Sequence, residues 1–85
     1  MNTIHWTDKA LRQARKIKDK AVRARLFDET QSLRDFPNCA GIKRLTDHAH
    51  SYRLRVGDYR VFFEFDGGVK VIFIEEVKKR DEHTY

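Results

Sequence analysis

The spacing of apolar residues changes near Gly41, and this change divides the chain into two parts of different structure. Before it, Ala10, Ala14 and Ile17 recur at the three- to four-residue spacing of a helix. After it, residues 52–65 alternate for most of their length between apolar and polar side chains, which is typical of half-buried strands. A chain with this order is predicted to be α+β, with helices covering one face of a sheet.

Two helices are expected before Gly41. Thr7 or Asp8 supplies an N-cap for the first helix, because a side-chain oxygen there satisfies a free backbone N–H. A break at residues 18–20 separates the second helix, and Pro37 ends it. The expected core residues are Ala10, Leu11, Ala14 and Ile17 in the first helix, and Val22, Leu26 and Leu33 in the second.

The strands are joined by two sequences that favour tight turns. Gly57-Asp58 is one and Asp66-Gly67-Gly68 is the other, since glycine accepts the positive φ of such turns. Strands are expected at residues 3–6, 51–56, 59–65 and 69–74, the last buried on both faces for most of its length. The prediction is a single domain over residues 1–85. An N-terminal strand precedes a two-helix hairpin, which packs on one face of a mainly antiparallel sheet of three to four strands.

The charge balance indicates the kind of partner. Eighteen Lys and Arg residues oppose thirteen Asp and Glu, so the net charge is +5. This excess suits a nucleic acid or an acidic protein, or it serves solubility alone. Cys39 is the one cysteine, which excludes an internal disulfide and fits a reducing cytoplasm. No apolar run approaches the ~18 residues of a membrane span, so no membrane partner is expected.

Three arginines are predicted to share one face of the sheet. Arg53 and Arg55 lie two apart on a strand, and a two-residue turn would pair Arg55 with Arg60. Their face is the one that the helices leave open. Adjacent like charges are unfavourable, and arginine binds phosphate with two parallel hydrogen bonds, so the cluster suits a phosphate. The alternative is an ordinary solvated face.

Several other side chains have a functional and a structural interpretation. Phe62 on the same face stacks on a base or lies in a core beneath the C-terminal residues. His83 suits proton transfer by its ordinary pKa of ~6.5, or is merely a solvated terminal residue. Tyr85 stacks on a base or packs on the sheet. His48 and His50 lack the accompanying ligands of common metal sites, so neither a metal nor another cofactor is expected.

A family resemblance is carried by residues 51–64, which read SYRLRVGDYRVFFE. This stretch resembles the Tyr-Arg-Leu-Arg-x-Gly-x-Tyr-Arg signature of the RelE/ParE superfamily, the toxins of type II toxin-antitoxin systems. Residues 41–45, GIKRL, and 77–80, VKKR, are also similar to that superfamily. The resemblance covers nearly the whole chain and implies a toxin of the RelE-like branch.

The resemblance implies an mRNA endoribonuclease that acts on the ribosome. In this reaction a 2′-hydroxyl of the mRNA attacks the adjacent phosphate without a metal. The implied partners are mRNA, the ribosome and an acidic cognate antitoxin, which binds the toxin as a hetero-oligomer. The implied catalytic residues are Arg53, Arg55, Arg60, Arg80, His83 and Tyr85. Arginine hardly ever loses its proton, so the general base is His83, Glu64, another histidine or a ribosomal group. The alternatives are a ParE-like DNA gyrase inhibitor and a non-toxic member that binds RNA or a partner.

Overall fold

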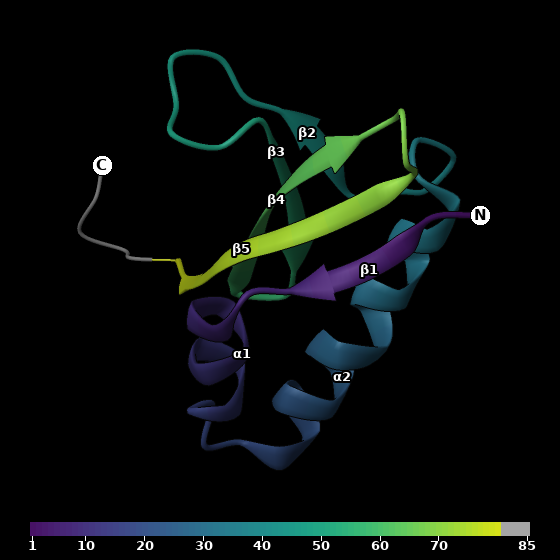
Figure 1. The fold of residues 1–85 in the computed structure, drawn as a ribbon. Helices are drawn as coiled ribbons and strands as arrows, with labels where there is room; N and C mark the ends of the chain where they lie inside the picture. Colours follow the sequence, from purple (N-terminus) through teal and green to yellow (C-terminus); the bar gives the residue numbers. More distant parts are fainter. Residues whose placement is uncertain (81–85) are drawn as a thin grey trace.

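The chain forms one strand, two α-helices and a short 3-10 helix before four further strands complete the sheet (Figure 1). The computed structural model describes residues 1–80. The elements are β1 (Thr3–Trp6), α1 (Asp8–Arg15), α2 (Lys20–Thr30), η1 (Gln31–Asp35), β2 (Ile42–Arg44), β3 (Tyr52–Val56), β4 (Tyr59–Asp66) and β5 (Val71–Lys79). The sheet order is β1-β5-β4-β3-β2.

The α+β prediction is confirmed, with both helices on one face of the sheet (Figure 1). The sheet has five strands, where the sequence predicted three or four. The additional strand is β2, whose three residues Ile42–Arg44 are too short to show an alternating pattern. β1 pairs with β5 in parallel, whereas the other neighbours are antiparallel.

Both helices begin at side-chain caps. Thr7, one of the two expected N-caps, accepts a hydrogen bond from the Ala10 N–H at 3.2 Å. Asp19 caps α2 by accepting from the backbone N–H groups of Ala21 and Val22. These contacts satisfy donors that have no partner inside the helix. Five of the predicted core residues are buried against the sheet, namely Ala10, Ala14, Ile17, Leu26 and Leu33, whereas Leu11 and Val22 are half-buried. The second helix ends at Thr30 and not at Pro37, so Leu33 reaches the core from η1.

The first hairpin has the predicted register. Val56 lies opposite Tyr59 and Arg55 lies opposite Arg60, with Gly57 at a positive φ of 57° in the turn. Leu54 and Val56 are buried against the helices. Alternation therefore directs the arginines of β3 to the open face.

The last strand differs from the prediction. β5 spans Val71–Lys79 and does not stop at residue 74, and Val69 is 66% exposed in the preceding turn. Only one face is fully buried along its first half, where Ile72 and Ile74 alternate with half-buried neighbours. The charged residues that seemed to follow the strand belong to it, because they pair with β4 as far as Tyr59.

A β-bulge interrupts the pairing of β4 with β5. Phe63 lies opposite Ile74, but Phe62 lies opposite Glu76, so Glu75 is an extra residue in β5. Ile74 and Val77 consequently both face the core, although their odd separation would otherwise place them on opposite faces. Glu76 faces the open side together with Phe62.

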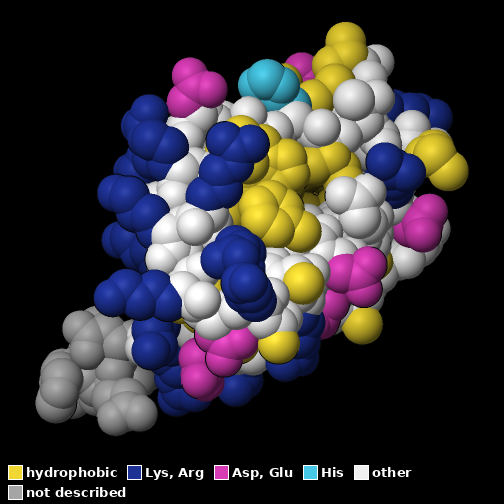
Figure 2. All heavy atoms as spheres, turned by 90° about the horizontal axis from the view of Figure 1, so that it is seen from below, with side chains coloured by type: hydrophobic (Ala, Val, Ile, Leu, Met, Phe, Trp, Pro, Cys, Tyr) yellow, Lys and Arg dark blue, Asp and Glu magenta, His cyan; other side chains and the backbone are white. Residues whose placement is uncertain are grey.

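The core lies between the helices and the sheet, and Phe63, Leu26, Leu33, Ile72 and Ile74 are its largest fully buried side chains. Figure 2, which views the molecule from below Figure 1, shows hydrophobic side chains at the centre and Lys and Arg side chains along one margin. Within residues 1–80, no helix has the length and apolar content needed to cross a membrane.

Candidate functional site

The open face of the sheet brings together the four arginines that the sequence predicted up to residue 80. Arg53, Arg55, Arg60 and Arg80 line one pocket of about 110 Å³, which is completed by Gly57, Asp58 and Tyr59. This arginine pocket lies at the β3–β4 turn, where β5 ends. The backbone N–H of Arg80 donates to the Asp58 carbonyl at 2.6 Å and so joins the end of β5 to the turn.

The charge of the arginine pocket is suited to an anion. Arg55 and Arg60 are directly cross-strand neighbours, and Lys78 on β5 lies opposite Arg60. Like charges in such positions repel each other, and a bound phosphate would remove that repulsion. The Nε atom of Arg53 is buried without a hydrogen-bond partner in the described part of the chain. An unsatisfied buried donor costs about 1–3 kcal/mol, and an anion in the pocket could supply an acceptor.

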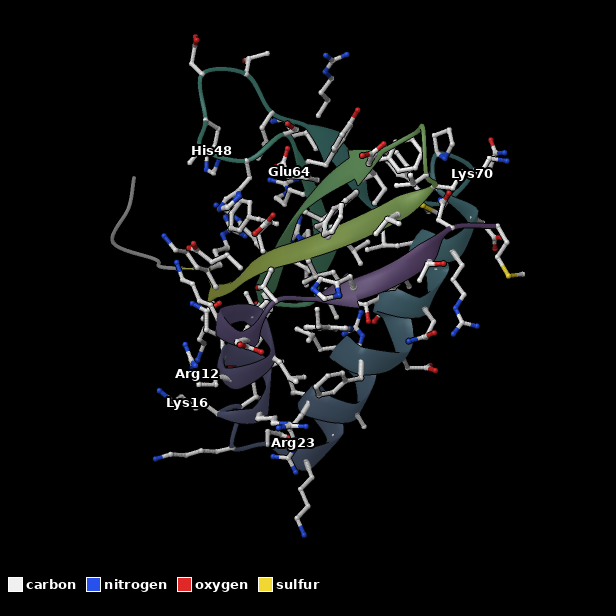
Figure 3. The ribbon with its side chains drawn as sticks, in the orientation of Figure 1. Arg12, Lys16, Arg23, His48, Glu64 and Lys70 are labelled. Carbon is white, nitrogen blue, oxygen red and sulfur yellow. The ribbon has the colours of Figure 1, made fainter. Side chains whose placement is uncertain are left out.

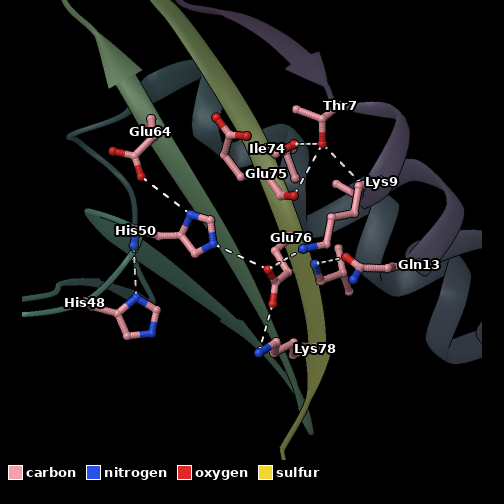
Figure 4. A network of polar contacts seen from close by, with 12 residues as sticks. Thr7, Lys9, Gln13, His48, His50, Glu64, Ile74, Glu75, Glu76 and Lys78 are labelled. Carbon is pink, nitrogen blue, oxygen red and sulfur yellow. Dashed lines mark hydrogen bonds and ion pairs between the residues drawn. The ribbon is translucent and has the colours of Figure 1, made fainter.

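The β-bulge decides which face the end of β5 presents to the arginine pocket. Beyond it, Glu76 and Lys78 lie on the open face, and Arg80 follows in the same alternation. The bulge is held by residues at the start of the helical region. The Thr7 hydroxyl donates to the Ile74 carbonyl at 2.9 Å, and the Gln13 amide oxygen accepts from the Val77 N–H at 2.7 Å (Figure 4). α1 therefore contributes to the position of Arg80.

A buried carboxylate lies beside the arginine pocket. Lys9 and Lys78 each donate to Glu76 at 3.0 Å (Figure 4). Burial raises the pKa of Glu76, but the hydrogen bonds and positive charges of the two lysines outweigh it and lower the pKa to about 2. Glu76 is therefore ionised at neutral pH and neutralises part of the basic face.

The loop between β2 and β3 folds over the open face. His48 and Glu64 both lie on this side of the molecule, whereas Arg12 and Lys16 project from α1 and its end into solvent (Figure 3). The rings of His48 and His50 stack on Phe62, with centroid distances of 5.1 and 5.4 Å. Phe62 is only 6% exposed, because these rings cover it. Its interpretation as a directly accessible stacking residue is therefore wrong, and His48 occupies the exposed position above it.

The structure also places one of the residues considered as a general base. Glu64 accepts hydrogen bonds from both the backbone N–H and the hydroxyl of Ser51. His50 lies between two carboxylates, with Nδ1 3.8 Å from Glu64 and Nε2 3.5 Å from Glu76 (Figure 4). Glu64 and His50 thus serve to hold the loop on the sheet. The other two predicted site residues, His83 and Tyr85, lie outside the described residues.

The remaining candidate groups have structural surroundings. Cys39 is half-buried against the core, and burial together with the negative charge of Asp35 raises the pKa of its thiol. Such a thiol is a poor nucleophile. Up to Arg80, His, Cys, Asp and Glu side chains form no group of three or more that could hold a metal ion.

Comparison with solved structures gives the same fold in three toxins. The RelE chain of the RelE–RelB complex from Pyrococcus horikoshii is 23% identical, with a TM-score of 0.74 over 95% of this chain and 97% of that chain. A chain of the RelBE2 toxin-antitoxin complex from Mycobacterium tuberculosis is 21% identical, with a TM-score of 0.78. The match covers 93% of this chain and 98% of that chain. The isolated RelE toxin from E. coli is 19% identical, with a TM-score of 0.79. The match covers 99% of this chain and 89% of that chain.

A family model assigns the sequence more directly. No curated protein gives a significant match. The model described as "ParE toxin of type II toxin-antitoxin system, parDE" matches residues 4–84, nearly the whole chain. Because the match extends over the strands and helices that build the arginine pocket, the chain belongs to the ParE toxin family within the RelE/ParE superfamily of type II toxin-antitoxin systems.

Proposed function

We propose that this toxin is a metal-independent endoribonuclease that cleaves mRNA on the ribosome. The observation that carries the proposal is the arginine pocket, in which Arg53, Arg55, Arg60 and Arg80 meet from three strand ends. Guanidinium groups bind phosphate oxygens in pairs and keep their charge at every working pH. The RelE-like fold of the solved toxins supports the same reading.

The chemistry follows from the donors in the pocket. The 2′-hydroxyl of one nucleotide attacks the adjacent phosphate and loses its proton to a base, while the bond to the 5′ oxygen of the next nucleotide breaks. The products are a 2′,3′-cyclic phosphate and a 5′-hydroxyl, whose proton comes from an acid. Negative charge grows on the phosphate oxygens in the transition state, and several fixed arginines stabilise it there.

Proton transfer requires groups other than the arginines. Of the alternatives, Glu64 already accepts two hydrogen bonds from Ser51, and both ring nitrogens of His50 face carboxylates. We therefore retain His83 as the proposed base, with a ribosomal group as the alternative. Tyr85 is proposed to stack on a base or to donate a proton.

The proposed partners are mRNA, the ribosome and an acidic antitoxin, which forms a hetero-oligomer with the toxin in the cytoplasm. Toxins of the same fold were crystallised with their antitoxins, including the RelE–RelB complex from Pyrococcus horikoshii and the RelBE complex from E. coli. The net charge of +5 favours an acidic segment on the open face.

Inhibition of DNA gyrase is the second candidate function, and the ParE description of the matching family favours it. Two assays separate the candidates. Primer extension on cellular mRNA after brief expression detects cleavage, and a supercoiling assay with purified gyrase detects inhibition. Cleavage without gyrase inhibition supports the proposal, whereas gyrase inhibition without cleavage supports the alternative. Harmless expression with neither effect would identify a non-toxic member.

A further inference from the structure

The loop of residues 45–51 is fixed on the open face at several points. The Leu45 N–H donates to the Ser51 carbonyl at 2.8 Å, which closes the loop at its base. The Ser51 N–H donates to Glu64 at 2.8 Å, and the half-buried ring of His50 lies between Glu64 and Glu76. These contacts connect the loop to both β4 and β5 and set the position of the residues at its tip.

His48 is the exposed residue that these contacts place over the sheet. Its ring lies nearly parallel to the Phe62 ring, with an interplanar angle of 16° and a centroid distance of 5.1 Å. The His50 N–H donates to His48 Nδ1 at 3.0 Å and fixes the rotation of the imidazole. Because His48 is exposed while Phe62 is buried, the opposite face of the imidazole is turned to solvent.

This ring lies close to the arginine pocket. Phe62 is the direct cross-strand partner of Arg53, and Arg53 lines the pocket. Directly opposed side chains on one sheet face have Cβ atoms about 4.5–5.5 Å apart. An exposed aromatic ring thus lies on the same sheet face as a pocket of positive charge, above the cross-strand neighbour of one of its arginines. This combination suits single-stranded nucleic acid.

We propose that His48, supported by Phe62, stacks on a nucleobase next to the phosphate held in the arginine pocket. The inference rests on the proposed RNA-cleaving function and adds a substrate-binding residue to it. His48 binds the base through its ring face, so the contact tolerates any of the four bases. Its role is to position the RNA strand, while charge stabilisation remains with the arginines.

Two variants separate the ring from the hydrogen bond. His48→Phe keeps an aromatic ring and removes the acceptor for the His50 N–H. His48→Asn keeps an acceptor, since asparagine commonly bonds the backbone N–H two residues on, and removes the ring. Thr46→Ala is the matched control, because Thr46 is exposed in the same loop. Unchanged melting temperatures of the three variants would show that the fold is retained.

The test uses single-turnover cleavage at subsaturating toxin, on ribosomes programmed with a short synthetic mRNA. Two further mRNAs each carry one abasic ribonucleotide beside the scissile phosphate, one on its 5′ side and the other on its 3′ side. Loss of one base–aromatic stack, worth about 1–3 kcal/mol, corresponds to about 5- to 150-fold in binding. We expect this loss for His48→Asn, near-normal rates for His48→Phe and Thr46→Ala, and a similar loss for wild type on one of the abasic mRNAs. His48→Asn should lose nothing further on that mRNA.

Wild-type rates for His48→Asn, or equal losses for His48→Asn and His48→Phe, would overturn the stacking role. Additive losses from His48→Asn and the abasic site would also overturn it, because the two changes would then affect different contacts. A failure of the proposed function is distinct from these outcomes: the wild-type toxin itself would then leave every mRNA intact.

Discussion

The side-chain oxygen of Gln13 accepts a hydrogen bond from the backbone N–H of Val77 at 2.7 Å, across 64 positions of sequence. The bulge at Glu75 removes regular pairing from this part of β5, and Gln13 supplies the partner that the Val77 N–H needs. This one contact connects α1 to β5, and Arg80 of the arginine pocket follows directly after β5.

Replacement of Gln13 is expected to affect stability and activity together. Gln13→Leu leaves the Val77 N–H without its acceptor, which costs about 1–3 kcal/mol. It should also lower the cleavage rate, because the bulge that sets the face of Arg80 loses a support. Urea unfolding and single-turnover cleavage measure the two effects.

Two further variants serve as controls for Gln13→Leu. Gln13→Glu retains an acceptor oxygen and should keep more of the stability and activity. Arg12→Ala changes the neighbouring residue, which is exposed and points away from the sheet (Figure 3), and should change stability by less than about 0.5 kcal/mol. Equal destabilisation by Gln13→Leu and Arg12→Ala would show that the Val77 contact has no particular role.

The alternation of side chains and the length of the turn were sufficient to predict where most of the arginines on the open face lie. A two-residue turn fixes the register on both sides of it, so the position of Arg55 opposite Arg60 followed directly from Gly57-Asp58. The bulge was not predictable in this way, because strict alternation along residues 72–80 assumes that no residue is inserted. Arg80 was therefore assigned by family resemblance alone, and the structure supplies the physical reason for its position.

The position of the loop of residues 45–51 could not be predicted from the sequence, for a different reason. His48 and His50 are expected from the sequence as metal ligands at most, or as one of the other histidines that could act as a base, since the loop has no periodicity that would place it on the sheet. Its position depends on contacts of Ser51 with Glu64 and of His50 with Glu76, each between segments distant in sequence. The exposed aromatic position above Phe62 was for that reason missed.

Acid should destabilise the protein through Glu76. Its folded-state pKa of about 2 lies below the ordinary value of 4.5, so the unfolded state binds the proton more readily. The resulting stabilisation is complete above pH ~5 and is lost as pH falls toward 2. A shift of this size corresponds to at most about 3 kcal/mol, and less because Lys9 and Lys78 are 60% and 65% exposed.

The measurement for Glu76 is urea unfolding at pH 7, 5 and 3. Wild type should lose stability between pH 5 and pH 3, and Glu76→Gln should be less stable at pH 7 with a weaker pH dependence in that window. A Glu76→Gln variant with the wild-type pH dependence would assign the acid sensitivity to other carboxylates.

Binding of the antitoxin, which we propose to be acidic, should weaken as salt is raised, because exposed charges are screened within ~8–10 Å at moderate ionic strength. Arg55→Gln on the open face should reduce this salt dependence. Lys20→Gln removes the same charge from the exposed start of α2 and should leave it unchanged. Titration calorimetry at several salt concentrations measures both effects. Affinity that is indifferent to salt would contradict an electrostatic interface on the arginine face.

His83 is proposed to move the proton from the attacking 2′-hydroxyl. His83→Ala should therefore slow the chemical step strongly while ribosome binding is preserved, and should remove a transition near pH 6–7 from the rate profile. Thr84→Ala is the neighbouring control. Single-turnover cleavage across pH measures both variants, and a wild-type rate and profile for His83→Ala would leave a ribosomal group as the leading base.

Arg60→Ala tests whether the arginine pocket cleaves RNA. Arg60 lies immediately after the turn and lines the pocket with the three other arginines. Loss of one donor to the transition state typically reduces the rate ~100- to 1000-fold. The measurement is single-turnover mRNA cleavage on programmed ribosomes at saturating toxin, for wild type and Arg60→Ala with equal melting temperatures. We expect rapid cleavage by wild type and a loss of that size in Arg60→Ala, whereas equal cleavage by the two proteins would show that the arginine pocket is not the site of cleavage.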